Sequence, residues 1–304
     1  MDTRPRTILL TGATGYVGGT LLGPLLDAGH DVRCLVRRPE RADLDRRATV
    51  VKGDVVSGYG LAGAMEDVDT VYYLVHSMGQ SDDFAATDRR AARNVAGAAD
   101  EAGVERIVYL GGLDEAAADG SDGPSEHLRS RHEVAELLGQ GRARLVYAQA
   151  AMVIGAGSAS FQIVQALVDR LPLMLTPRWV DTPSQPIAID DVVHALQALG
   201  TYEDVPDEAQ LGGADVLSYR DMMARYAEVA GKRSPAIVPV PVLTPGLSSH
   251  WVSLFSPVDN GVVRPLVDGL SVEMRVRTPP PPGINDAPLG FDEAVRRALA
   301  PDTA

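Results

Sequence analysis

Residues 7–18 read T-I-L-L-T-G-A-T-G-Y-V-G, and this stretch decides the fold. An apolar run ends in a glycine-rich turn, and a helical pattern begins near Tyr16. Three glycines punctuate it: Gly12, Gly15 and Gly18. In that order they permit a tight turn, a close approach of the backbone to a pyrophosphate, and close packing of the helix on the strand. Because a helix N-terminus also attracts phosphate, the stretch predicts a dinucleotide-binding strand, loop and helix.

The composition is that of an acidic globular chain. Its 304 residues carry a formal net charge of −13, which argues against a nucleic-acid backbone or an anionic membrane surface as the main partner. No signal-peptide pattern and no apolar run long enough to span a bilayer are present. Cys34 is the only cysteine, which excludes an intramolecular disulfide. We therefore expect a cytoplasmic protein that acts on a small molecule; its oligomeric state stays open.

Apolar segments alternate with helical patterns along the first half of the chain. The expected strands are residues 8–10, 31–36, 50–51, 71–75, 104–110 and 143–149. This alternation predicts an α/β fold with a Rossmann-type doubly wound parallel sheet, in which ligands bind beyond the carboxyl ends of the strands. We expect an NAD(P)-binding Rossmann domain over residues 1–150. Residues 151–304 are expected to form a smaller, partly interleaved substrate lobe with proline-rich connectors.

Two helix starts in the second half have candidate caps. Asp190 stands where it can cap a helix over residues 187–200, and Ser218 stands at the start of a helical pattern that runs to Ala230. Residues 247–270 form an apolar, moderately amphipathic stretch. This stretch is either a lobe that covers the substrate or a patch that touches a partner.

The end of the second strand bears on the choice of cofactor. Arg37 and Arg38 stand there, about twenty residues past the loop, where the dinucleotide fingerprint expects an acidic residue. A carboxylate binds the ribose hydroxyls of NAD, whereas a guanidinium pairs with a 2′-phosphate. The two arginines favour NADP over NAD, with NAD still possible, unless they are simply solvated surface side chains. Asp54, after the third strand, is a candidate for the adenine amino group.

Several segments carry a family resemblance. They are the phosphate loop, V-R-C-L-V-R at 32–37, G-D at 53–54, Y-Y-L-V-H-S-M at 72–78, H-L-R-S-R-H-E at 127–133 and T-P-R-W-V at 176–180. Together they resemble extended, atypical short-chain dehydrogenase/reductases, and most of all the NmrA-like NAD(P)H-binding proteins and relatives of the NAD(P)-binding accessory subunit of respiratory complex I. The resemblance implies the fold and a nicotinamide cofactor, and says little about the reaction.

The expected contacts to that cofactor come from the loops that follow the strands. The residues are Thr11, Gly12, Thr14, Gly15, Tyr16, Val17, Gly18, Arg37, Arg38, Asp54, Val55, Leu74 and Arg131.

The resemblance also implies a catalytic Tyr-x-x-x-Lys pair with an upstream Ser or Thr, and here the sequence departs from it. Lys52 and Lys232 are the only lysines, and neither lies four positions after a tyrosine. His127 and Arg131 stand on the helix where the pair is expected, and Gly111-Gly112 occupies the serine position. The standard catalytic pair is therefore absent.

The replacement chemistry has several candidates. Arg131 has the donors to bind the ribose hydroxyls, and His127 has a pKa suited to proton transfer near neutrality, unless it only caps the helix or faces solvent. His76 and Tyr73 end the fourth strand and are alternative acids, as is Tyr147 in the sixth. No metal is predicted, because no cluster has ligand spacing. The Ser-x-Ser run at 158–160 lacks the strand and elbow of a hydrolase nucleophile.

These observations favour an NADP-dependent oxidoreductase that transfers hydride to or from a carbonyl or quinone-like compound. Because the Tyr-Lys pair is absent, a non-catalytic NAD(P)H-binding redox sensor or assembly protein is the alternative. A nucleotide-sugar-epimerase-like enzyme that retains its cofactor is a further one.

Overall fold

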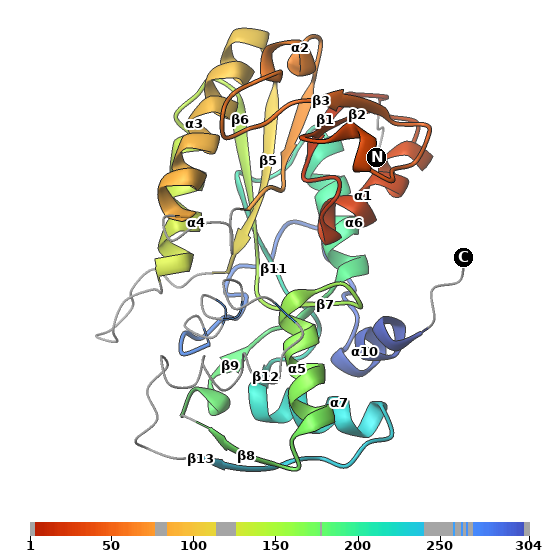
Figure 1. Ribbon diagram of the computed structural model, residues 1–304, viewed down its shortest axis with the longest axis vertical. Helices are drawn as coiled ribbons and strands as arrows, with labels where there is room; N and C mark the ends of the chain where they lie inside the picture. The colour runs from red at the N-terminus through yellow and green to blue at the C-terminus, as the bar shows by residue number, and fades with distance from the viewer. Residues whose placement is uncertain are drawn as a thin grey trace.

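A central parallel sheet organises the computed structural model, which describes residues 4–76, 84–113, 126–176, 178–239, 258, 263, 266 and 270–300 (Figure 1). Its seven strands lie in the order β11-β6-β5-β4-β1-β2-β3, and every neighbouring pair is parallel. The strands are β1 (Thr7–Thr11), β2 (Asp31–Val36), β3 (Thr49–Lys52), β4 (Thr70–Tyr73), β5 (Arg106–Gly112), β6 (Arg144–Ala150) and β11 (Glu208–Leu211). The predicted Rossmann-type doubly wound fold is confirmed.

The seventh strand, β11, is the one that the sequence pattern did not predict. It comes from the second half of the chain and pairs in parallel with β6, with Ala209 opposite Ala148. Ala209 and Leu211 are buried, while the residues between and before them are not. Such a short alternation is too brief to stand out in the sequence.

Helices cover both faces of the sheet (Figure 1). One face carries α1 (Tyr16–Asp27) and α6 (Ile189–Thr201), which contact each other. The other face carries α2 (Leu61–Met65), α3 (Phe84–Ala102) and α4 (Glu126–Leu138). A separate apolar core fills each side, so the sheet is buried on both faces, as a parallel sheet requires.

Helix α6 reaches the sheet from the second half of the chain. Its N-cap is Ala188, so Asp190 lies inside the first turn and the expectation that Asp190 caps this helix was wrong. Asp190 instead forms an ion pair of 2.7 Å with Arg297. At the other end of the helix, the buried guanidinium of Arg106 on β5 donates to the carbonyl oxygens of Leu199 and Tyr202 at 2.9 and 2.7 Å.

A third apolar cluster, called the lobe cluster below, lies beneath the carboxyl end of the sheet and is built from residues after Ala151. The helices given in full by the described residues here are α5 (Ala159–Arg170), α7 (Tyr219–Val229) and α10 (Phe291–Leu299). Three pairs of short strands accompany them: β7 (Val153–Ile154) with β10 (Ile187–Ala188), β9 (Pro183–Ser184) with β12 (Leu217–Ser218), and β8 (Leu173–Thr176) with β13 (Ala236–Pro239). Two 3-10 helices are η1 (Pro39–Arg41) and η2 (Arg178–Asp181). Ser218 caps α7 in a capping box with Asp221, as expected.

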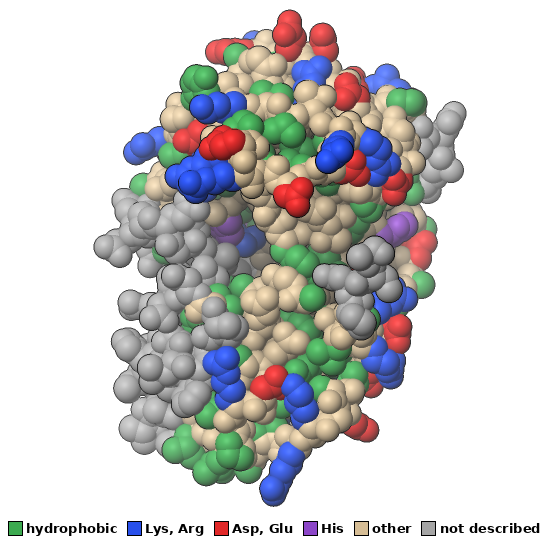
Figure 2. Space-filling model, turned by 45° about the vertical axis from the view of Figure 1, so that its right-hand side comes forward, with side chains coloured by type: hydrophobic (Ala, Val, Ile, Leu, Met, Phe, Trp, Pro, Cys, Tyr) green, Lys and Arg blue, Asp and Glu red, His purple; other side chains and the backbone are tan. Residues whose placement is uncertain are grey.

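The molecular surface mixes both signs of charge on the face seen in Figure 2. Apolar side chains gather at its lower end, where β8 and β13 expose Leu173, Leu175 and Val238. None of the described helices combines the length and apolar character needed to cross a membrane.

Most of the apolar stretch 247–270 lies outside the described residues. Among its described members, Val263 is fully buried in the lobe cluster, and Leu266 and Leu270 pack against that cluster.

The only cysteine offers a direct check on the packing of β2. Cys34 is fully buried, and burial raises the pKa of its thiol to about 11. Because the thiolate is the reactive form, we expect no labelling of the native protein by a thiol reagent at pH 8 over minutes, and complete labelling in denaturant. Absorbance with a chromogenic disulfide measures both states. Fast labelling of the native protein would contradict the described packing.

Candidate cofactor and substrate site

The phosphate loop joins β1 to α1 and has room only for glycine at two positions. Gly12 has φ +78°, and a Cβ built on it would lie 2.5 Å from the carbonyl oxygen of Leu74. A Cβ on Gly18 would lie 2.3 Å from the carbonyl oxygen of Gly12, so the helix packs directly on the loop. Gly15 is the N-cap of α1, and no side chain caps the first turn. The loop thus fits a pyrophosphate bound at the helix N-terminus.

Thr11 and Leu74 hold the loop to the neighbouring strand. The Thr11 hydroxyl is buried, donates to the carbonyl oxygen of Tyr72 at 2.9 Å, and accepts from the backbone N–H of Leu74 at 3.3 Å. The Thr11 side chain therefore sets the spacing of β1 and β4 rather than facing a ligand. Thr14 and Val17 lie in the loop and the first turn, and each lines one of two cavities.

The first cavity, about 500 Å³, lies between the phosphate loop and the segment after β2. Thr14, Gly15, Gly19 and Gly23 line one wall, and Arg41 with Asp43 and Asp45 lines the other. Sequence reasoning missed Arg41, because the fingerprint points only to the first residues after the strand.

The two arginines at the end of β2 are exposed. Neither Arg37 nor Arg38 makes a side-chain hydrogen bond or an ion pair to any described residue. By contrast, the nearby Arg47 pairs with Asp27 and Asp45 at 2.7 Å each. The guanidinium groups of Arg37 and Arg38 are thus available to a ligand.

Asp54 organises its own turn after β3. Its carboxylate accepts from the backbone N–H of Val56 at 3.0 Å and from the Ser57 hydroxyl at 3.2 Å. The next side chain, Val55, is buried in the core between the sheet and α3. The Asp54 carboxylate can therefore accept a hydrogen bond from a ligand only through the lone pairs that these two bonds do not use.

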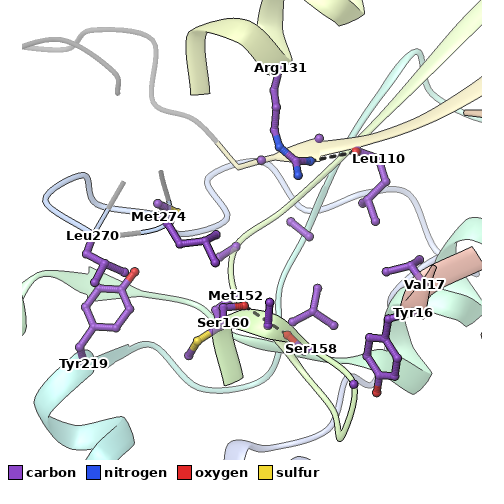
Figure 3. Close-up of a pocket in the computed structure, with 18 residues that line it drawn as sticks. Tyr16, Val17, Leu110, Arg131, Met152, Ser158, Ser160, Tyr219, Leu270 and Met274 are labelled. Carbon is purple, nitrogen blue, oxygen red and sulfur yellow. Dashed lines mark hydrogen bonds between the residues drawn. The ribbon is translucent and has the colours of Figure 1, made fainter. Parts of the chain in front are cut away.

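The second cavity, about 360 Å³, lies beyond the carboxyl ends of β5 and β6 (Figure 3). Tyr16 and Val17 stand on one side of it, Tyr219, Leu270 and Met274 on the other. The ring of Tyr16 packs on the segment after β6, because a Cβ on Gly155 or Gly157 would fall within 2.3 Å of that ring or its hydroxyl. The start of α1 thus contributes to this cavity as well as to the phosphate loop.

Arg131 on α4 reaches into this second cavity from above the end of β5 (Figure 3). Its guanidinium donates to the carbonyl oxygen of Leu110 at 3.2 Å. Among the described residues that line the cavity, Arg131 alone carries a charge. Arg131 lies on the helix where the resemblance places a lysine, and its side chain lines the cavity.

The upstream serine of the family has no room at Gly111. A Cβ there would lie 2.5 Å from the ring of Tyr147. Tyr147 stacks on Tyr109 at 5.4 Å between centroids, and Tyr109 contacts Tyr73 at 5.8 Å. Tyr73 and Tyr147 are both buried, and burial raises the pKa of the Tyr73 hydroxyl well above its usual range. These tyrosines pack the core, as the simpler interpretation of a strand tyrosine expects.

The two histidine candidates differ in what the structure describes. The side chain of His127 lies outside the described residues, and only its backbone in α4 is placed. His76 follows β4, and its Nδ1 lies 3.0 Å from the carboxylate of Asp88 on α3. Burial, with a contribution from Arg131, lowers the pKa of His76 to about 4. At neutral pH this imidazole is therefore uncharged, and it does not line the second cavity.

Sequence reasoning set aside two serines that the structure brings to the second cavity. Ser158 and Ser160 lie at the start of α5, on the side opposite Arg131 (Figure 3). Their hydroxyl oxygens are 3.2 Å apart and share one hydrogen bond. The described ranges contain no cluster of three or more His, Cys, Asp or Glu side chains placed to hold a metal ion.

Residues 12–150 match the family model described as NAD(P)H-binding. The chain is 31% identical over 112 residues to a 3-beta-hydroxysteroid dehydrogenase of Mycolicibacterium neoaurum, a match that covers 34% of this chain and 31% of that protein. It is 42% identical over 106 residues to a (4-alkanoyl-5-oxo-2,5-dihydrofuran-3-yl)methyl phosphate reductase of Streptomyces griseus subsp. griseus, covering 34% and 33% of the two chains. The match thus spans about a third of the length of either relative.

The fold as a whole has counterparts among solved structures. A nucleoside-diphosphate-sugar epimerase from Staphylococcus aureus superposes with a TM-score of 0.74 at 18% identity, and the match covers 95% of this chain and 99% of that one. At this identity the likeness extends to the fold alone.

Proposed function

We propose that this chain is an NADP-dependent oxidoreductase of small apolar carbonyl or quinone-like compounds. Its residues 12–150 match the NAD(P)H-binding domain that is expected of an atypical short-chain dehydrogenase/reductase. The domain binds a nicotinamide cofactor, which supplies or accepts a hydride when bound. Gly12, Gly15 and Gly18 form its pyrophosphate site, and Arg131 supplies donors to the nicotinamide ribose.

The observation that carries this proposal is the apolar second cavity, which adjoins the phosphate loop through Tyr16 and Val17. A nucleotide-sugar substrate needs several donors or cations for its diphosphate, whereas a single guanidinium stands among the described lining residues. Apolar walls with few polar groups favour an apolar ligand. The two relatives named above, a hydroxysteroid dehydrogenase and a reductase, support the same reaction class.

The preference for NADP rests on Arg37 and Arg38. Changing both to alanine is expected to weaken NADPH binding about 30-fold, because each removes a charged partner worth about 1 kcal/mol at an exposed site. NADH binding should change less than about threefold, since NADH lacks the 2′-phosphate. Titration calorimetry with both nucleotides measures the change. Equal losses for the two nucleotides would place these arginines elsewhere than at the 2′-phosphate.

Oxidation of NADPH in the presence of a panel of aldehydes, ketones, enones and quinones tests the activity itself. We expect turnover with at least one apolar acceptor and none with nucleotide sugars. In the same assay, His127→Ala tests the proposed proton donor, and unchanged turnover would remove His127 from that role. Tight NADPH binding without turnover on any acceptor would contradict the oxidoreductase proposal.

A second candidate is a cofactor-binding sensor or assembly protein. It is favoured by the missing Tyr-x-x-x-Lys pair and by the lack of room for a serine at Gly111. A difference in protease sensitivity between the NADPH-bound and NADP⁺-bound protein, without turnover, would support this candidate over the enzyme.

A further inference from the structure

Two hydroxyl groups form the polar end of a cavity whose walls are otherwise mostly apolar. Ser158 is 6% exposed, and Ser158 and Ser160 both line the second cavity. In Figure 3 they lie across the cavity from Arg131, with Met152 beside them. A ligand that fills the space between therefore meets the guanidinium at one end and the two hydroxyls at the other.

Ser158 occupies the N-cap position of α5 and does not act as a cap. Its backbone is extended, as at most N-caps, yet its side chain accepts no hydrogen bond from the first turn. A serine at this position ordinarily stabilises the helix through that bond. Here the hydroxyl instead makes the bond to Ser160, over the 3.2 Å between the two oxygens. The usual structural reason for a serine at this site is thus absent.

One of the two hydroxyl protons of this serine pair is not used by the hydrogen bond between them. Two hydroxyls carry two protons, and the bond between their oxygens uses one of them. No other side-chain hydrogen bond involves either hydroxyl among the described residues. Whichever of the two hydroxyls carries it, the second proton is therefore available to an acceptor inside the cavity.

We propose that Ser158 and Ser160 together bind the carbonyl oxygen of an uncharged, apolar ketone or enone, and so fix the acceptor end of the substrate. This inference rests on the proposed function, because it places a carbonyl compound in the same cavity. An uncharged donor pair suits a neutral oxygen, whereas a carboxylate would be drawn to Arg131. In a reduction, the carbonyl carbon gains the hydride and the oxygen gains a proton from the donor proposed above, His127, which water then reprotonates, so both serines keep their own protons.

Binding of a small enone tests this assignment without requiring turnover. With NADP⁺ saturating, ligand-observed NMR gives dissociation constants for cyclohex-2-en-1-one and for cyclohexene, which has the same ring without the oxygen. The double variant Ser158→Ala/Ser160→Ala is expected to weaken enone binding about tenfold, the effect of one hydrogen bond, and to leave cyclohexene binding unchanged. Ser160→Thr keeps a hydroxyl and should stay within about threefold of the parent protein.

The controls separate this idea from folding and from the proposed activity. The double variant should bind NADPH as the parent does and unfold at the same temperature, since Ser158 caps nothing. Enone binding that is unchanged in the double variant, or no preference for the enone over cyclohexene in the parent, overturns the assignment. Serine-dependent enone binding without hydride transfer to any acceptor would sustain the assignment and refute the oxidoreductase proposal.

Discussion

Replacing Gly18 with alanine is expected to weaken NADPH binding about 100-fold or more. The added Cβ would lie 2.3 Å from the carbonyl oxygen of Gly12, a backbone atom in the phosphate loop. The atoms that the new methyl group meets belong to the backbone and not to a flexible side chain, so the first turn of α1 and the loop must move apart. The backbone N–H groups that we propose bind the pyrophosphate then no longer point to one place.

Gly97→Ala is the matched control, because Gly97 also lies in a helix but has nothing within 4 Å of the added methyl group. It should leave NADPH binding unchanged and stabilise the protein by up to about 1 kcal/mol through helix propensity. Calorimetric titration and thermal unfolding of both variants give the comparison. If Gly18→Ala binds NADPH like the parent while remaining folded, the phosphate loop is not the cofactor site.

Replacing Arg106 with alanine is expected to lower the free energy of unfolding by about 3 kcal/mol or more. The buried guanidinium donates to the carbonyl oxygens of Leu199, Tyr202 and Glu203, at the C-terminal end of α6. These carbonyls have no partner inside the helix, and the positive charge also suits the negative end of the helix dipole. Without the guanidinium, the buried carbonyl oxygen of Leu199 stays unsatisfied, and the part-buried carbonyl oxygens of Tyr202 and Glu203 lose their partner.

Arg47→Ala serves as the comparison, since Arg47 is 53% exposed and its ion pairs with Asp27 and Asp45 lie at the surface. Such pairs contribute about 0–1 kcal/mol. Denaturant unfolding measures both losses, and in thermal unfolding we expect the midpoint temperature of the Arg106 variant to fall by about 5 °C. Equal losses in the two variants would mean that Arg106 does not anchor α6.

The sequence was sufficient for the parts of the fold that local pattern encodes. Runs of apolar residues, and the glycines that end those runs, predict the phosphate loop and six of the seven strands. They also predict that helices cover both faces of the sheet. β11 did not follow, because only its pairing with β6 makes four residues into a strand. Asp190 was misplaced as a cap, since an acidic residue suits both the N-cap and the first turn, and only the backbone angles distinguish them.

The candidate site also contains residues that the sequence could predict and residues that it could not. The glycines and the position of Arg131 could be predicted, because each is tied to a motif or to a fixed place on a helix. The serine pair could not, because its role depends on which helix start faces the cavity. Arg41 was missed because the dinucleotide fingerprint points only to the first residues after β2, and the side chain of His127 lies outside the described residues.

The contribution of α6 and β11 to the sheet has a consequence for how the protein is made. The ribosome finishes the first 150 residues well before it reaches residues 189–211, which cover one face of the sheet and complete its edge. Until then Ile8, Leu10 and Val146 lack the apolar neighbours from α6 and β11 that complete their core. The domain that matches the NAD(P)H-binding model is thus made first and completes its core late. One apolar face of its sheet stays incompletely covered while about 60 further residues are made, which takes several seconds.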